Sequence, residues 1–347
     1  MSISNSRLQT PDSQDPTSNS QLPTSNSQVA TNALAVTAAH ARRELSKVIV
    51  GQEEALKLLL LTLVCRGHAL IEGVPGTAKT LAVRAIARLL GLRFHRVQCT
   101  PDLMPGDIVG ANVFNMGTSQ FVLHEGPVFT DLLLVDEINR MPPRTQAALL
   151  EAMEERQVTI DGNTRPLSKE FCAFATQNPI DFEGTYPLPE AELDRFLVKI
   201  RIGYPKPENQ EEEGILRRYH EGFDARDLDA VDLQPLPGAV LQEARRGVAA
   251  VRAEPAMFGY IAAIARKTRE WPALTLGASP RAAINLLQLA KAIAAIDGRD
   301  YLLPDDVKSA APPVLRHRLV LKPEADLEGV DSDQVVQDVL RAVEVPK

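Results

Sequence analysis

Apolar residues follow two patterns over roughly the first 200 residues of the chain. Short runs of mostly apolar residues predict strands of a parallel sheet that is buried on both faces. Between these runs, apolar residues recur at helical spacing, as at Leu56, Leu59, Leu60 and Leu63. This alternation is typical of an α/β fold with helices on both faces of a parallel sheet. The expected strands are His68–Glu72, Phe94–Gln98, Asp131–Val135, Phe171–Ala175 and Leu197–Ile202, and the expected helices cover 32–46, 52–65, 81–90 and 143–156.

Two further segments predict β-hairpins. Residues 109–114 and 120–124 would pair across a turn at 115–118, and residues 158–167 would turn at Asp161-Gly162.

The pattern changes after Gly203, where strand signals vanish. A linker begins at Tyr204, and helices are expected at about 207–220, 237–252, 256–270, 280–297 and 304–318. We therefore expect an α/β domain over 32–203 and a linker with a first helix over 204–236. A small helical domain with a C-terminal tail would cover 237–347.

The N-terminal segment, residues 1–31, is rich in Ser, Asn, Gln, Thr and Pro. Its residues Pro16–Gln21 recur as Pro23–Gln28. With almost no large apolar side chains to bury, this segment is predicted to be disordered.

Composition and charge narrow the class of protein. The 347 residues have a formal net charge of −7 and a pI of about 5.5, which gives no sign of general affinity for nucleic acid or anionic membranes. No apolar segment approaches the roughly 18 residues of a membrane span. The three cysteines, Cys65, Cys99 and Cys172, are scattered and lack metal-type spacing. We therefore expect a soluble protein of the reducing cytoplasm, without membrane insertion.

A glycine-containing loop joins the first expected strand to the helix that follows. A loop of this kind, here Gly73–Thr80, presents backbone N–H groups to phosphate oxygens. Lys79 would reach the β- and γ-phosphates, and the hydroxyl of Thr80 would hold Mg²⁺. A lysine in a first helical turn opposes the helix dipole, which disfavours an ordinary structural turn. The strict pattern has glycine where Ala78 stands, which we take as a mild change. The nucleotide-contacting residues would be Gly73, Val74, Pro75, Gly76, Thr77, Ala78, Lys79, Thr80 and Leu81.

An acidic pair follows the apolar run 131–135. Ligands bind at the carboxyl ends of parallel strands, so Asp136 and Glu137 would face the same phosphates. Asp136 could hold Mg²⁺, and Glu137 could polarise the water that attacks phosphorus. The presence of Glu137 beside Asp136 favours water, rather than a second substrate, as the acceptor of the γ-phosphoryl group.

Three more polar residues occupy positions that suit a phosphate site. Asn178 follows the strand 171–175, and its amide could bind the γ-phosphate and the water. Arg195 lies on an expected short helix, Pro189–Phe196, just before the last strand. Arg281 lies in the first turn of a helix capped by Ser279, a poor position for a cation without an anion nearby.

In this order, the motifs resemble those of the MoxR-type AAA+ ATPases. They are the phosphate loop, Leu-Val-Asp-Glu-Ile-Asn-Arg140, Ala-Thr-Gln-Asn-Pro179, Tyr-Pro-Leu-Pro-Glu190, Leu-Asp-Arg-Phe196 and Gly-Ala-Ser-Pro-Arg281. The resemblance extends from about residue 32 to the C-terminal region. It implies an AAA+ P-loop core followed by an all-α lid, with ATP and Mg²⁺ as ligands.

The resemblance also implies a role for each residue. Lys79 and Thr80 would belong to Walker A, and Asp136 and Glu137 to Walker B. Asn178 would be the first sensor, Arg195 the arginine finger and Arg281 the second sensor. Val50, Gly51 and Gln52 would line the adenine. The hairpin between 101 and 129 would be the helix-2 insert, facing the pore of a hexameric ring together with the hairpin 158–167.

The expected function is ATP hydrolysis coupled to the remodelling or maturation of a client protein, including metal-cofactor insertion or complex assembly. The partner would be a separate von Willebrand factor A domain protein or another client. One alternative is a ring motor acting on nucleic acid or as a chelatase-like subunit, although the acidic composition argues against nucleic acid. DNA-stimulated turnover would favour that alternative. A module that uses nucleotide only as a switch fits poorly with the set of acid, sensor and arginines.

Overall fold

The computed structural model describes residues 25–179 and 184–346. At its centre lies a five-stranded sheet in the order β2-β5-β8-β1-β9, with every neighbouring pair parallel. The predicted α/β fold and its parallel sheet are confirmed. The strands are β1 (Ala69–Gly73), β2 (Phe94–Gln98), β5 (Leu132–Asp136), β8 (Cys172–Gln177) and β9 (Val198–Ile202).

Helices cover both faces of this sheet. Ile71 and Leu134 pack in one core with α2 (Glu53–Val64) and α3 (Lys79–Leu89). Their neighbours Leu70 and Leu133 point to the other face and pack in a second core with α5 (Pro143–Glu155), which follows the short helix η1 (Ile138–Arg140). Because successive side chains of a strand alternate between two buried faces, the central strands are apolar along most of their length and turn polar only near their carboxyl ends.

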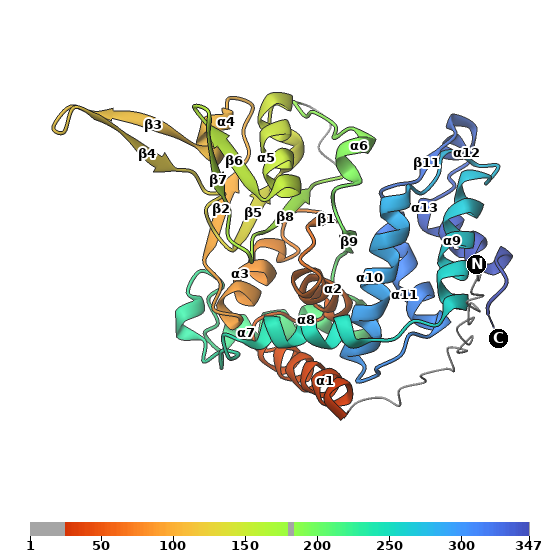
Figure 1. Ribbon diagram of the computed structural model, residues 1–347. Coiled ribbons are helices and arrows are strands. Elements are labelled where there is room, and N and C mark those ends of the chain that lie inside the picture. The colour runs from red at the N-terminus through yellow and green to blue at the C-terminus, as the bar shows by residue number, and fades with distance from the viewer. Residues whose placement is uncertain (1–24, 180–183, 347) are drawn as a thin grey trace, which may run out of the picture.

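Both predicted hairpins are present. They are β3 (Gly110–Asn115) with β4 (Gln120–Glu125), and β6 (Gln157–Ile160) with β7 (Asn163–Pro166). A short helix that the sequence analysis did not predict, α4 (Pro105–Val109), precedes the first hairpin. The β3–β4 hairpin extends away from the body of the molecule (Figure 1), and Phe114 contacts Phe121 across it with ring centroids 5.3 Å apart. Phe121 remains 71% exposed, so the hairpin presents an apolar surface to its surroundings.

The first helix is longer than expected. It is α1 (Ser25–Leu45), so it begins seven residues before the predicted start at 32 and takes in part of the repeated polar segment. Once a helix is nucleated, each further residue that is fixed adds one hydrogen bond without the cost of a new nucleus, which allows such an extension. The disorder predicted for residues 1–24 lies outside the described residues.

The segment 204–236 differs from the linker and first lid helix that we expected. It contains η2 (Pro207–Asn209), α7 (Glu211–His220) and η3 (Leu228–Ala230), and it runs back over the α/β domain. Leu236 N–H donates to the carbonyl oxygen of Leu89 at 2.8 Å, and Gln234 N–H donates to Glu44 Oε2 at 2.9 Å. These hydrogen bonds attach the segment to α3 and α1 rather than to the helical domain.

The helical domain follows. α8 lies along α1 (Figure 1), and the remaining helices form a bundle beside the edge strand β9. The region expected as a C-terminal tail ends in a helix, α13, whose buried face includes Val335 and Val339. Two very short strands, β10 and β11, also pair in this domain, although no strand was expected here; two or three residues are too few to show a period.

The elements after Gln177, besides β9 and the segment 204–236, have the following bounds. They are α6 (Glu190–Leu193), α8 (Val240–Ala250), α9 (Pro255–Arg269), β10 (Leu274–Leu276), α10 (Pro280–Ile296), α11 (Pro304–Leu315), β11 (Val320–Leu321), α12 (Pro323–Leu327) and α13 (Ser332–Ala342).

The cysteines pack inside the protein. Cys65, Cys99 and Cys172 are all buried free thiols, and burial raises the pKa of each to about 12. Within residues 25–179 and 184–346, no helix is long and apolar enough to cross a bilayer.

Buried His68 should make the fold weaken as the pH falls below 6.5. Its ring bridges Met153 and Ala173: Nε2 lies 3.1 Å from Met153 O, and Nδ1 accepts a hydrogen bond from Ala173 N–H at 2.9 Å. Burial, assisted by Arg156, lowers the pKa of His68 from 6.5 to about 4, so between these values the unfolded chain binds a proton that the native protein does not. The free energy of unfolding contributed by this group is therefore present above pH 6.5 and lost toward pH 4, by about 1.4 kcal/mol for each pH unit. Urea denaturation at pH 7, 6 and 5 measures this slope, and His68→Gln should reduce it; an unchanged slope in that variant would contradict the assignment.

Candidate active site

The loop between β1 and α3 has the backbone of a phosphate cradle. Gly73 lies against the edge strand, where a Cβ would approach Ile202 O to 2.4 Å, and Gly76 has φ of 82°. Both positions therefore favour glycine. Lys79 Nζ donates to the carbonyl oxygens of Gly73 and Val74, the latter at 3.0 Å, so its ammonium group already lies over the loop.

Ala78 is strained rather than a mild replacement within a helical turn. It is the N-cap of α3 and has φ of 61°, in the left-handed region. Glycine in the strict motif thus reflects backbone conformation at this position, and a Cβ there costs about 1–2 kcal/mol.

We expect Ala78→Gly to stabilise the protein by up to about 1 kcal/mol, because relief of the left-handed strain exceeds the added chain entropy of glycine. Urea unfolding measures the change. The matched control is Ala82→Gly, a buried position inside the same helix, which should destabilise. A loss of stability in both variants would show that Ala78 is not strained.

Asp136 ends β5 and lies at the centre of a hydrogen-bonded group. It is 8% exposed, and its Oδ1 accepts from Thr176 Oγ1 at 2.5 Å. Its Oδ2 accepts from Thr80 Oγ1 at 3.3 Å and pairs with the guanidinium of Arg96 at 2.7 Å. The threonine of the loop and the acid of the strand are thus brought together as predicted.

Glu137 also has a left-handed backbone, with φ of 60°. Its N–H donates to Thr176 Oγ1 at 2.9 Å, while its Oε2 accepts from Gln98 Nε2 at 3.0 Å and pairs with Arg140 at 3.1 Å. Strained backbone concentrates at functional sites, and here it orients the carboxylate at the carboxyl edge of the sheet.

Asn178 belongs to the same edge. It follows β8, which lies between β5 and β1, and its side chain is buried at 8% exposure. The ends of three adjacent strands therefore place the loop, the acidic pair and this amide together.

Arg195 and Arg281 lie elsewhere in the same subunit. Arg195 Nε pairs with Glu154 Oε2 at 3.0 Å, and Arg281 pairs with the other oxygen of the same carboxylate. Arg195 precedes β9, and Leu197 N–H bonds to His68 O just before β1, which places this group at the amino edge of the sheet. The five residues of β1 separate the two edges by about 16 Å at the rise of a strand. The structure thus brings the two arginines to each other but not to the phosphate loop.

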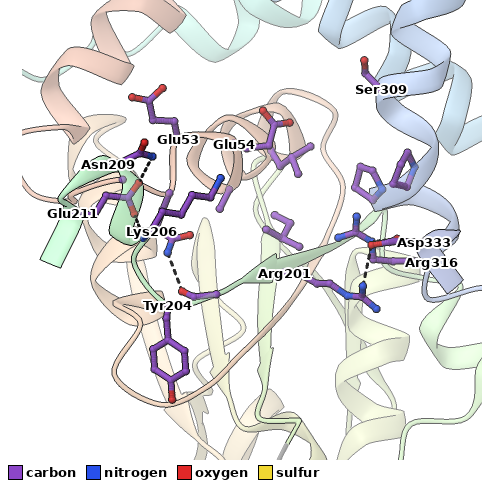
Figure 2. A pocket seen from close by; sticks show the side chains of 18 residues that line it. Glu53, Glu54, Arg201, Tyr204, Lys206, Asn209, Glu211, Ser309, Arg316 and Asp333 are labelled. Carbon is purple, nitrogen blue, oxygen red and sulfur yellow. Dashed lines mark hydrogen bonds and ion pairs between the residues drawn. The ribbon is translucent and has the colours of Figure 1, made fainter. Parts of the chain in front are cut away.

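A cavity of about 790 Å³ opens between the start of α2, the segment after β9, and α11 (Figure 2). Gly51 and Gln52 line it, and Gln52 Nε2 donates to Gly203 O at 3.0 Å. Val50 lies beside Gly214 of α7. The volume suits a nucleoside. Its arginines, Arg201 and Arg316, both pair with Asp333 at 2.9 Å, so their charge is already compensated.

Two sequence profiles of known families match the chain. The family described as ATPase family associated with various cellular activities (AAA) matches residues 68–198, and the AAA lid domain matches residues 266–339. Chaperone MoxR1 of Mycobacterium tuberculosis is 42% identical over 321 residues, covering 90% of this chain and 83% of that protein. The chain belongs to the MoxR-type AAA ATPases. YeaC of Bacillus subtilis is 44% identical over 306 residues, covering 88% of this chain and 94% of that protein.

A solved structure agrees with this assignment. The crystal structure of an inferred ATPase from Cytophaga hutchinsonii superposes with a TM-score of 0.83 at 39% identity, covering 93% of this chain and 98% of that one. The AAA core and lid of the MoxR-type fold are therefore present in the described residues.

Several residues of the candidate site were not predicted from the sequence. Arg96 and Gln98 contact the acidic pair from β2, and their polar alternation along that edge strand was the available signal. Glu211 is buried and accepts a hydrogen bond from Lys206 N–H at 2.8 Å, and its carboxylate lies against Gly51. It therefore fixes the segment after β9 at this position. The hydrogen bond from Lys206 lowers the pKa of Glu211. No local pattern predicts that contact, because it joins residues about 160 positions apart.

Proposed function

We propose that this MoxR-type protein hydrolyses ATP with Mg²⁺. The observation that supports the proposal best is the convergence of the loop, Asp136, Glu137 and Asn178 at one edge of the sheet. The loop and Lys79 would bind the phosphates. Gly51 and Gln52, which line the cavity, would hold the base together with the preceding residue, Val50.

The oxygens of Thr80 and Asp136 suit Mg²⁺. They are hard ligands that lie 3.3 Å from each other, and Mg²⁺ is usually held by one or two protein oxygens together with phosphate and water. Among the described residues, no group of three or more His, Cys, Asp or Glu side chains could hold a metal. When bound, Mg²⁺ would neutralise charge on the phosphate oxygens.

Glu137 would orient and polarise the attacking water, and Asn178 would hold that water and the γ-phosphate. Gln98 and Arg140 already restrain the Glu137 carboxylate, so it would need little reorientation.

Arg195 and Arg281 would act on the nucleotide of a neighbouring subunit. At the amino edge they lie about 16 Å along β1 from the phosphate loop, too far to contact the nucleotide of the same subunit. A head-to-tail ring would bring one subunit's amino edge to the next subunit's carboxyl edge. We propose a homo-oligomer, a hexameric ring by family resemblance, in which hydrolysis depends on assembly.

The ring would remodel or mature a client protein. MoxR1 is named a chaperone, and the exposed apolar residues of the β3–β4 hairpin offer a contact surface. The partner would be a separate von Willebrand factor A domain protein or another client.

Lys79→Ala should weaken ATP affinity about 10-fold or more and lower hydrolysis with it, because an ammonium group beside phosphate is lost. Fluorescent ATP binding and phosphate release measure both quantities. Lys308→Ala, which removes a partly exposed lysine of α11, is the matched control and should behave as wild type. Wild-type affinity in Lys79→Ala would overturn the phosphate-loop assignment.

A further inference from the structure

A buried arginine of the lid holds the segment 194–197, which contains Arg195. The side chain of Arg318 is 2% exposed, and its Nε donates to Asp194 Oδ1 at 2.6 Å. A guanidinium has five N–H donors. The remaining four reach backbone carbonyls, namely those of Asp194 at 3.1 Å, Leu197 at 3.2 Å, Phe196 and Val314. Every donor therefore has an acceptor, and four of the five acceptors belong to residues 194–197.

The same carboxylate also reaches the helix of Arg281. Ser279 Oγ lies 3.1 Å from Asp194 Oδ1 and 2.9 Å from Oδ2, and it accepts from Ala282 N–H at 3.1 Å as the N-cap of α10. Asp194 is the residue before Arg195, and Ser279 is two residues before Arg281. One ion pair, between buried Arg318 and partly buried Asp194, thus fixes the backbone of both arginines.

We propose that Arg318, acting through Asp194 and Ser279, positions Arg195 and Arg281 for the nucleotide of the neighbouring subunit. This rests on the proposed trans role of those arginines. Arg318 is a positioning residue, since its own donors are all engaged within the subunit.

The chemistry of the pair supports a geometric role. Burying an ion pair is costly, and an apolar contact of the same volume often stabilises a fold as well or better. The planar fork of arginine instead fixes several acceptors at set angles, which the point charge of lysine cannot do. Misplacement of a catalytic group by 1 Å can cost about 100-fold in rate.

The amino edge lies about 16 Å from the phosphate loop along β1, so loss of positioning should spare a subunit's own nucleotide site. The defect should therefore lower hydrolysis at the neighbouring subunit's site and leave ATP binding by the variant subunit unchanged. A general weakening of the fold would lower both.

Arg318→Lys tests this. We expect wild-type affinity for fluorescent ATP and turnover reduced about 10- to 100-fold. When this variant is mixed with Glu137→Gln protein, activity should return in mixed assemblies, because Arg318→Lys subunits retain Glu137 and receive intact arginines from the other variant. Arg299→Lys is the matched control: Arg299 holds Asp306 through its two terminal nitrogens, one at 2.7 Å, within the same lid, and its turnover should stay within twofold of wild type.

Arg195→Ala mixed with Glu137→Gln serves as the reference for rescue. Rescue of Arg195→Ala without rescue of Arg318→Lys would overturn the positioning role alone, and failure of both would overturn the trans assignment with it. Wild-type turnover in Arg318→Lys, or a parallel loss of ATP affinity, would also overturn the positioning role. If Arg318→Lys does not fold, Asp194→Asn replaces it in the same experiments, because asparagine keeps the shape of the side chain and removes its charge. The expected results are the same.

Discussion

Glu137→Gln should bind ATP as well as the wild-type protein and lose turnover by a factor on the order of 10²–10⁴. The amide keeps the size of the side chain and can still contact Gln98, but it cannot accept the proton of the attacking water. Binding should persist because the loop and Lys79 are unchanged. Single-turnover phosphate release and fluorescent ATP binding measure the two quantities separately.

Glu155→Gln, an exposed carboxylate at the end of α5, is the control and should retain full turnover. Hydrolysis at the wild-type rate by Glu137→Gln would remove this residue as the general base. Because the variant should remain loaded with ATP, affinity purification with it should retain a client that wild-type protein releases. A von Willebrand factor A domain protein among the captured partners would favour the proposed chaperone role.

The sheet and the carboxyl-edge site could be predicted because their signals are local. Apolar runs set the strands, and parallel topology then places whatever follows each strand at one edge, which is why Asp136 and Asn178 were expected together. The conformation of Ala78 could not be obtained in this way. Its left-handed φ depends on how the loop closes, and residue type alone suggested only a mild change.

Contacts between segments far apart in the sequence were the main features that could not be predicted. Segment 204–236 has no strong periodicity. It is held by one backbone hydrogen bond to Leu89 and by another to the carboxylate of Glu44. The amino-edge cluster is similar: Glu154, Arg195 and Arg281 come from three elements, and only the assembled fold shows that one carboxylate joins both arginines. Short motifs singled out Arg195 and Arg281, but they did not indicate that the two lie together.

Arg195→Ala should lower turnover by about 10³-fold while leaving ATP affinity near wild type. A positioned guanidinium stabilises charge that develops on the transferring phosphoryl group, and its loss affects the transition state more than the bound substrate. Arg266→Ala, which removes an exposed arginine of α9, should leave turnover unchanged. An equal loss in both variants would point to a general effect of charge on assembly.

Mixing the Arg195→Ala and Glu137→Gln proteins distinguishes action in trans from action within one subunit. An Arg195→Ala subunit retains Glu137, so a neighbour that supplies Arg195 should restore its hydrolysis, although each protein alone is inactive. Arg281→Ala should follow the same pattern, since both arginines pair with Glu154 at the amino edge. Co-purification through a tag on one variant confirms that mixed assemblies form. If such assemblies stay inactive, the arginines do not serve the neighbouring site. Rescue of Arg195→Ala but not of Arg281→Ala would instead assign Arg281 to its own subunit, through a movement of α10 away from Glu154.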